Sequence, residues 1–215
     1  GDLDQLAMLV SSPATAHLLL EDYADLSPGD WILQTAANSA VGSAVVQLAR
    51  ARGLRTVNIV RREEVVAELK ALGADVVLVG TDDLVERIGA ATEGASIPLA
   101  FDAIGGPLLG LLVKALGQGG TLVSYSQVLH EPRAITPADL IFKQVTLRGF
   151  WLSQWFAEAS PADKQALFGQ LVPRVASGQL RLAVDSTYPL DQITEAVARS
   201  MGGRRTGKVL LHPND

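Results

Sequence analysis

Short runs of branched apolar residues alternate along the chain with longer segments whose apolar residues recur every three or four positions. The short runs predict buried strands, and the longer segments predict amphipathic helices. We expect strands at 31–35, 55–60, 76–79, 99–103, 121–124 and 146–151, and helices at 40–52, 63–72, 83–91, 107–116 and 137–142. This alternation predicts an α/β fold in which crossover helices join the strands of a parallel sheet.

Six strands with five crossover helices are the content of a complete Rossmann fold, a doubly wound six-stranded parallel sheet with strand order 3-2-1-4-5-6. Before this unit, a helix is expected at 13–22 with Ser12 as its N-cap, because Pro13 suits a first helical turn. After it, we expect a helix at 162–177, a strand at 182–188, a helix at 191–200 and a strand at 208–211. The last two strands have no neighbours inside a six-stranded parallel sheet.

The turn between the first strand and its helix carries small residues where dinucleotide-binding turns carry glycine. Ala37, Ser39 and Gly42 occupy the three glycine places of the G-x-G-x-x-G pattern. The first two places need small side chains so that backbone N–H groups can approach a pyrophosphate, and the third lets helix and strand pack closely. A tight turn in any α/β protein also favours small residues. This pattern alone therefore fits either a dinucleotide-binding turn or an ordinary tight turn.

Two arginines, Arg61 and Arg62, stand at the end of the second strand, about twenty residues after the turn. NAD-binding domains carry Asp or Glu here for the ribose 2′-hydroxyl, whereas arginine meets the 2′-phosphate of NADP. Because cations are otherwise disfavoured at a helix N-terminus, the pair favours NADPH. The alternative is a solvated helix start in which the arginines pair with Glu63 or Glu64. An S-adenosylmethionine-dependent methyltransferase is disfavoured, because it needs an acidic residue here.

Composition limits the remaining possibilities. A chain of 215 residues, 48% of them apolar, can bury one core and an appendage but not two large domains. The absence of cysteine excludes disulfides, cysteine-ligated zinc and a cysteine nucleophile. The net charge of −5 argues against nucleic acid or an anionic membrane as the main partner. No apolar run reaches the ~18 residues that span a bilayer and no signal peptide is recognisable, so we expect a cytoplasmic protein.

Several conspicuous residues have structural explanations beside functional ones. Trp151 and Trp155, beside Phe150, would form either a stacking surface or a packed core or subunit contact. We interpret Asp102, at the end of the fourth strand, as a carboxylate that orders the following loop rather than as a base. His17 is interpreted as a packing residue, and the three histidines are too scattered to predict a metal site.

Three segments, taken in order, resemble one family. They are 29–42, which ends in Ala-Ala-Asn-Ser-Ala-Val-Gly, then Leu-Gly-Ala-Asp at 72–75, and finally Leu-Ile-Phe-Lys-Gln-Val-Thr-Leu-Arg-Gly-Phe-Trp-Leu-Ser-Gln-Trp at 140–155. Together they resemble the medium-chain dehydrogenase/reductase superfamily in its zinc-free, quinone oxidoreductase-like branch. They are most similar to its NADPH-dependent trans-2-enoyl thioester reductases. The resemblance covers essentially the whole chain, and 140–155 is its most specific part.

This resemblance implies a set of cofactor contacts and no catalytic or metal-binding residue within the chain. It assigns the pyrophosphate turn to Asn38, Ser39, Ala40, Val41 and Gly42, the 2′-phosphate to Arg61, Arg62 and Glu63, the nicotinamide ribose to Tyr125, Ser126, Gln127 and Val128, and the nicotinamide to Phe150, Trp151 and Leu152. Lys208 would reach the cofactor from the tail, and Ser12 stands where the family has Asn before Pro-x-Thr-Ala. The sequence also departs from the family at Ala40 and at Ser126-Gln127, where glycines are usual and allow a freer backbone.

The resemblance further implies an upstream GroES-like catalytic domain, which in the family holds the tyrosine that protonates the substrate. We therefore expect residues 1–12 to be the remnant of a linker, 13–155 to be the NADP-binding Rossmann domain, and 156–215 to return toward the catalytic domain. In this superfamily the sixth strand often pairs across a dimer, which makes 146–151 a predicted homodimer interface.

The implied reaction is hydride transfer from NADPH to the β-carbon of a 2-enoyl thioester, followed by protonation at the α-carbon. Because half of the pocket would belong to the other domain, we expect the chain alone to be inactive. The alternatives are a quinone or alkenal reductase of the same superfamily and a non-catalytic NADPH-binding module.

Overall fold

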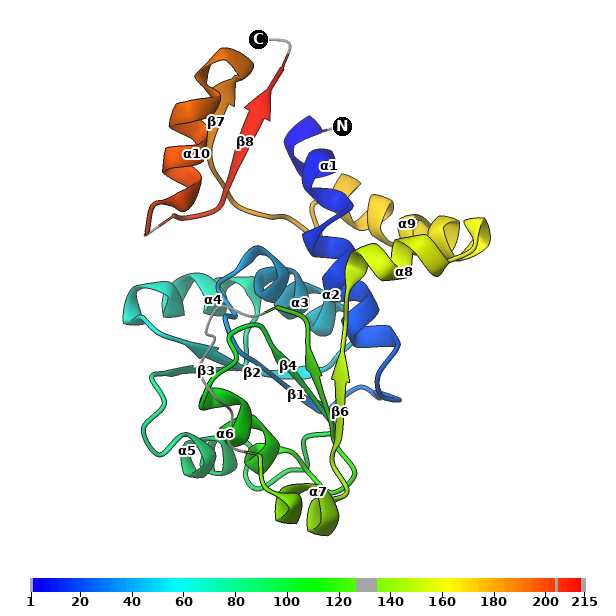
Figure 1. Cartoon of the computed structure of the whole chain (residues 1–215), viewed down its shortest axis with the longest axis vertical. Coiled ribbons are helices and arrows are strands. Elements are labelled where there is room, and N and C mark those ends of the chain that lie inside the picture. The colour runs from blue at the N-terminus through cyan, green and yellow to red at the C-terminus, as the bar shows by residue number, and fades with distance from the viewer. Residues whose placement is uncertain (1, 127–134, 204, 214–215) are drawn as a thin grey trace.

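The computed structural model describes residues 2–126, 135–203 and 205–213, and its main body is one twisted parallel sheet between helices (Figure 1). The six strands lie in the order β3-β2-β1-β4-β5-β6 and every neighbouring pair is parallel. Their bounds are β1 Trp31–Gln34, β2 Arg55–Val60, β3 Val76–Val79, β4 Leu99–Asp102, β5 Thr121–Ser124 and β6 Thr146–Gly149. The predicted fold class and strand order are confirmed.

Helices cover both faces of this sheet, as Figure 1 shows with α3 on one side and α5 and α6 on the other. The crossover elements are α3 Ala40–Ala51, the 3₁₀ turn η1 Glu63–Val65, α4 Val66–Leu72, α5 Leu84–Ala91, α6 Leu108–Ala115 and α7 Pro137–Lys143. On the α3 face, Ile32 and Phe101 join a buried cluster with Val45. On the opposite face, Leu33 packs with Leu112 of α6. The central strands β1, β2 and β4 are therefore buried on both sides, which explains their mainly apolar runs.

Four further helices pack around the α3 side of the sheet: α1 Leu3–Leu9, α2 Ser12–Glu21, α8 Leu152–Glu158 and α9 Pro161–Ala176. Helix α1 was not predicted, because seven residues are too few to form a stable helix alone. Hydrogen bonds to a distant part of the chain stabilise this helix. The buried Gln5 side-chain amide donates to the carbonyl of Leu182 at 2.9 Å and accepts from the backbone N–H of Leu182 at 2.8 Å. Ser12 as N-cap was wrong, since Ser11 precedes α2 and makes no side-chain cap bond, while Ser12 is buried in the first turn.

The C-terminal residues form a separate two-stranded parallel sheet, β7 Val184–Pro189 with β8 Lys208–His212, connected through η2 Leu190–Gln192 and α10 Ile193–Met201 (Figure 1). This agrees with the expectation that these strands have no place in the main sheet. Asp185 of β7 accepts hydrogen bonds from the guanidinium of Arg199 and from the N–H of Thr206 at 2.9 Å. These bonds hold α10 and the segment before β8 against β7.

A membrane-crossing helix is absent from residues 2–126, 135–203 and 205–213, where no helix combines sufficient length with sufficient apolar character.

Candidate functional site

The turn after β1 is held tight by its backbone and by one helix cap. Ala36 has a φ of 50°, in the left-handed region that alanine rarely adopts. Ser39 then caps α3, its Oγ accepting a hydrogen bond from the N–H of Gly42 at 3.1 Å. A Cβ on Gly42 would lie 2.5 Å from the carbonyl oxygen of Ala37 and 2.6 Å from its Cα. Only glycine fits there, so the third place of the degenerate motif has the close packing that the sequence predicted.

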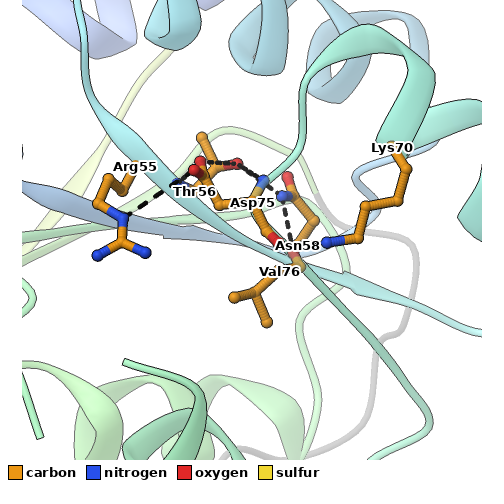
Figure 2. A network of polar contacts seen from close by, with 6 residues as sticks. All are labelled: Arg55, Thr56, Asn58, Lys70, Asp75 and Val76. Atoms are coloured by element: carbon orange, nitrogen blue, oxygen red, sulfur yellow. Dashed lines mark hydrogen bonds and ion pairs between the residues drawn. The ribbon is translucent and has the colours of Figure 1, made fainter. Parts of the chain in front are cut away.

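A buried polar layer lies under this turn. Gln34, the last residue of β1, donates through Nε2 to the carbonyl of Gly42 at 3.0 Å and to Oδ1 of Asn58 at 2.7 Å. Asn58 in turn donates to Oγ1 of Thr56 and to the carbonyl of Val76, as Figure 2 shows. Gln34, Asn58 and Thr56 are all buried. Hydrogen bonds thus connect the first turn of α3 with the middle of the sheet.

A pocket of about 350 Å³ opens at the carboxyl ends of the central strands. Arg61, directly after β2, is exposed and lines it, together with Asn38 from the turn. Arg62 and Glu63 were assigned to the same place, but they are not among its lining residues; Arg62 precedes η1 and Glu63 begins it. The two arginines are therefore not equivalent, because only the first faces the pocket.

The rest of the pocket wall comes from residues that sequence reasoning missed: Ala36, Ile59, Val60, Gly80, Thr81, Ile104, Pro107 and Leu108. They lie at or after the ends of four different strands. Because ligands of α/β proteins bind outside the carboxyl ends of the strands, these positions could have been predicted from the expected strand ends.

Asp102 orders the loop that supplies part of this wall. Its Oδ1 accepts from the hydroxyl of Thr35 at 2.9 Å and from the N–H of Ile104 at 3.0 Å, and the N–H of Gly105 also donates to the carboxylate. The carboxylate is fully buried. The interpretation of Asp102 as a loop-ordering residue is confirmed.

Tyr125, directly after β5, lies near Ser39 at the N-terminal end of α3. Tyr125 packs against the buried cluster that Ala40 and Val41 also contact. Its hydroxyl is buried and lies near the hydroxyl of Ser39, although among the described residues no hydrogen bond of good geometry reaches it. Burial raises the pKa of Tyr125, with the Ser39 hydroxyl acting in the opposite direction, so the phenol stays protonated at neutral pH. Ser126 is exposed, and the assignments of Gln127 and Val128 lie outside the described residues.

The segment 150–155 divides between packed and exposed aromatics. Phe150 packs edge-on against Tyr23, with ring centroids 6.3 Å apart, and Leu152 contacts the same cluster. Trp155 packs against Phe156. Trp151 is 69% exposed and stands as the N-cap of α8, so the strand ends at Gly149 and not at Trp151 as predicted. Of the two tryptophans, only Trp155 is a packing residue.

The remaining assigned residues lie away from the pocket. Lys208 begins β8 in the separate C-terminal sheet, and Ser12 is buried in α2. Neither lines the pocket. If Ser12 and Lys208 contact the cofactor as predicted, they do so outside this pocket. For metal ions, no group of three or more His, Cys, Asp or Glu side chains with suitable placement exists within the described ranges.

Comparison with known proteins places this architecture in a family. The sequence profile of the zinc-binding dehydrogenase family matches residues 40–167. The human mitochondrial enoyl-[acyl-carrier-protein] reductase is 37% identical over 97% of this chain and 57% of its own length, and the Dictyostelium discoideum protein of the same name is 33% identical over 97% and 61%.

Solved structures of similar proteins share this fold. The quinone oxidoreductase of Pseudomonas syringae pv. Tomato DC3000 superposes with a TM-score of 0.86 at 26% identity, over 99% of this chain and 66% of that one. A mutant enoyl thioester reductase from Candida tropicalis, 24% identical, shares the fold with a TM-score of 0.87 over 99% and 62%. The chain thus spans about 57–61% of the length of the enoyl reductases that it matches. It belongs to the zinc-binding dehydrogenase family, within the medium-chain dehydrogenase/reductase superfamily.

Proposed function

We propose that these residues bind NADPH and that the whole protein reduces the activated C=C bond of a 2-enoyl thioester. The observation that carries the proposal is Arg61, which lines the pocket at the carboxyl ends of the central strands. A guanidinium at this strand end favours a 2′-phosphate over a 2′-hydroxyl, because it offers paired donors and a permanent positive charge.

The turn at the start of α3 fits a pyrophosphate. The N–H groups of Ala40 and Val41 precede the first hydrogen bond inside the helix, and the positive end of the helix dipole lies beside them. Gly42 supports this arrangement, because the absence of a side chain allows the turn to lie against the helix. The walls of the pocket are mainly apolar, which suits a base such as adenine.

For the nicotinamide half, the proposal extends to the residues after β5 and β6. Tyr125, whose buried phenol stays protonated at neutral pH, would lie along the nicotinamide ribose. The packed ring of Phe150 would give a rigid apolar contact. NADPH supplies the hydride when bound, while the protein residues orient it and exclude water. Ser12, Arg62, Glu63, Trp151 and Lys208 stay predictions from the family resemblance.

Enoyl reduction is preferred over quinone reduction on the identity of the relatives. The two enoyl reductases compared by sequence are 33% and 37% identical to this chain. Among the solved structures, the quinone oxidoreductase at 26% and the Candida tropicalis enoyl thioester reductase at 24% do not separate the two reactions. The reaction is proposed for the whole protein, and for these 215 residues we propose cofactor binding without turnover. The reason is that the family resemblance assigns the proton-donating tyrosine to a GroES-like domain.

Two assays test these proposals. NADPH fluorescence titration of the 215-residue chain should show saturable binding, and absence of binding would refute the cofactor proposal. Loss of NADPH absorbance is then followed with crotonyl-CoA or a benzoquinone. The chain should turn over neither, so rapid consumption would refute the expected inactivity. In the whole protein, crotonyl-CoA should be the faster substrate, and activity with the quinone alone would favour the alternative.

We also propose that the edge strand β6 pairs with a second copy of the chain. All four of its residues are exposed, and β5 is its only partner in the described sheet. The adjacent helix α7 exposes Ile141 at 65% and Phe142 at 76%. An unprotected strand beside an apolar helix is typical of an interface. In sedimentation velocity, Phe142→Glu should weaken the dimer while Leu3→Glu, at an equally exposed apolar position, should not; a monomeric native protein would contradict the proposal.

The location in the cell stays a prediction. The human and Dictyostelium discoideum relatives are mitochondrial by name, whereas the sequence led us to expect a cytoplasmic protein.

A further inference from the structure

Two amides that are completely buried face each other in the centre of the sheet. Gln34 of β1 and Asn58 of β2 are register partners, and both side chains are 0% exposed. Nε2 of Gln34 donates to Oδ1 of Asn58 at 2.7 Å. Both lie on the face that α3 covers, where the neighbouring buried residues are mainly apolar. A polar pair in such surroundings needs an explanation.

The pair is the centre of a longer chain of hydrogen bonds. On one side, Nε2 of Gln34 also donates to the carbonyl of Gly42 at 3.0 Å, in the first turn of α3. On the other side, Nδ2 of Asn58 donates to Oγ1 of Thr56 at 2.8 Å and to the carbonyl of Val76 at 3.0 Å, as Figure 2 shows. The turn, β1, β2 and the start of β3 are thus connected by side-chain bonds in addition to the backbone ladder.

Stability alone does not explain this arrangement. Oε1 of Gln34 is buried and has no hydrogen-bond partner in the described part of the chain. A buried acceptor without a donor costs free energy, whereas two apolar side chains of similar volume would fill the same space without that cost. Hydrogen bonds have preferred directions and so fix the orientation of the groups that they join, which contacts between two apolar side chains would not do.

We propose that Gln34 and Asn58 are positioning residues that fix the distance between the turn at Gly42 and the strand end at Arg61. Asn58 of β2 lies three residues before Arg61, which directly follows that strand, and Nε2 of Gln34 donates to the carbonyl of Gly42. The inference rests on the proposed function, in which the pyrophosphate lies at the turn and the 2′-phosphate at Arg61. A ligand that spans both places depends on their spacing, and a ligand that contacts only one does not.

Apolar replacements of similar side-chain shape separate positioning from folding. Gln34→Met leaves Oδ1 of Asn58 without its donor, and Asn58→Leu leaves Oγ1 of Thr56 and Nε2 of Gln34 each with one partner fewer. In the double variant the two apolar side chains face each other, so it should be more stable than the sum of the single effects predicts. Gln5→Met is the control, because Gln5 is also a buried glutamine with two hydrogen bonds but supports α1 instead.

Calorimetric titrations of the chain with NADPH and with adenosine 2′-phosphate provide the test. The native protein should bind both. In Gln34→Met and in the double variant, NADPH should bind about tenfold more weakly while adenosine 2′-phosphate changes by less than about twofold. Gln5→Met should change neither. Undiminished NADPH affinity in the double variant, or equal losses for both ligands, would overturn the positioning role. Failure of the native protein to bind either ligand would instead refute the proposed function on which it rests.

Discussion

Replacement of Gly42 by alanine is the sharpest test of the geometry at the α3 turn. The added Cβ would lie 2.5 Å from the carbonyl oxygen of Ala37, 2.6 Å from its Cα and 2.7 Å from its carbonyl carbon. All three are backbone atoms, so no side-chain rotation can relieve the contact. The helix and the turn would have to separate by about 0.9 Å to reach an ordinary contact of 3.4 Å.

The size of the effect follows from two opposing contributions. Overpacking of a closely packed core costs about 1–3 kcal/mol, and contact with fixed backbone puts this site in the upper half of that range. Alanine has a higher helix propensity than glycine, and this raises the free energy of unfolding by up to about 1 kcal/mol. The expected net loss in the free energy of unfolding is about 1–3 kcal/mol, a decrease of about 2–12 °C in Tm for a chain of this size.

Urea denaturation at equilibrium measures this loss, and Gly169→Ala is the matched control. Gly169 also lies inside a helix, α9, but no atom lies within 4 Å of a Cβ built on it. Its replacement should leave stability unchanged or raise it by up to about 1 kcal/mol. Gly42→Ala should also weaken NADPH binding, because the turn moves. If Gly42→Ala matches the control in both measurements, the close approach of turn and helix is wrong.

Three other predictions concern single contacts. The Arg199 guanidinium holds the pKa of Asp185 below its ordinary value of 3.8, so Asp185→Asn should lower the free energy of unfolding at pH 7. Measured by urea denaturation, the difference between the variant and the native protein should shrink as the pH falls below 3.8. A difference that stays constant with pH would contradict this. Burial lowers the pKa of His17 below 6.5, with Glu21 opposing, so native stability should fall as the pH drops through 6.5 and His17→Gln should flatten that slope. Thr35→Val removes a buried donor to Asp102 and an acceptor for Ala103, which should cost about 1–3 kcal/mol by chemical denaturation, and a neutral result would count against that bond network.

The sheet was predictable because its central strands β1, β2 and β4 are buried on both faces and therefore appear as mainly apolar runs. Helix α1 was not, because its stability comes from the bonds of Gln5 to Leu182, far away in the sequence. The end of β6 was placed two residues too late, since Phe150 and Trp151 continue an apolar pattern while the chain already leaves the sheet after Gly149.

The candidate site was predictable only where it is local. The turn and the arginines lie in continuous segments with recognisable chemistry. The pocket wall combines Ala36, Thr81 and Ile104, which follow three different strands and which no local pattern connects. The difference between Arg61 and Arg62 likewise depends on which side chain faces the cavity, and adjacent identical residues carry no signal of that.

The most direct test of the central claim is the selectivity of the chain for NADPH over NADH. Fluorescence titrations of the native protein should show NADPH binding about tenfold or more tightly, as expected for charge-assisted hydrogen bonds to the 2′-phosphate. Arg61→Ala should abolish this selectivity, and Arg62→Ala should retain most of it, because only Arg61 lines the pocket. Equal affinity of the native protein for NADPH and NADH would contradict the account.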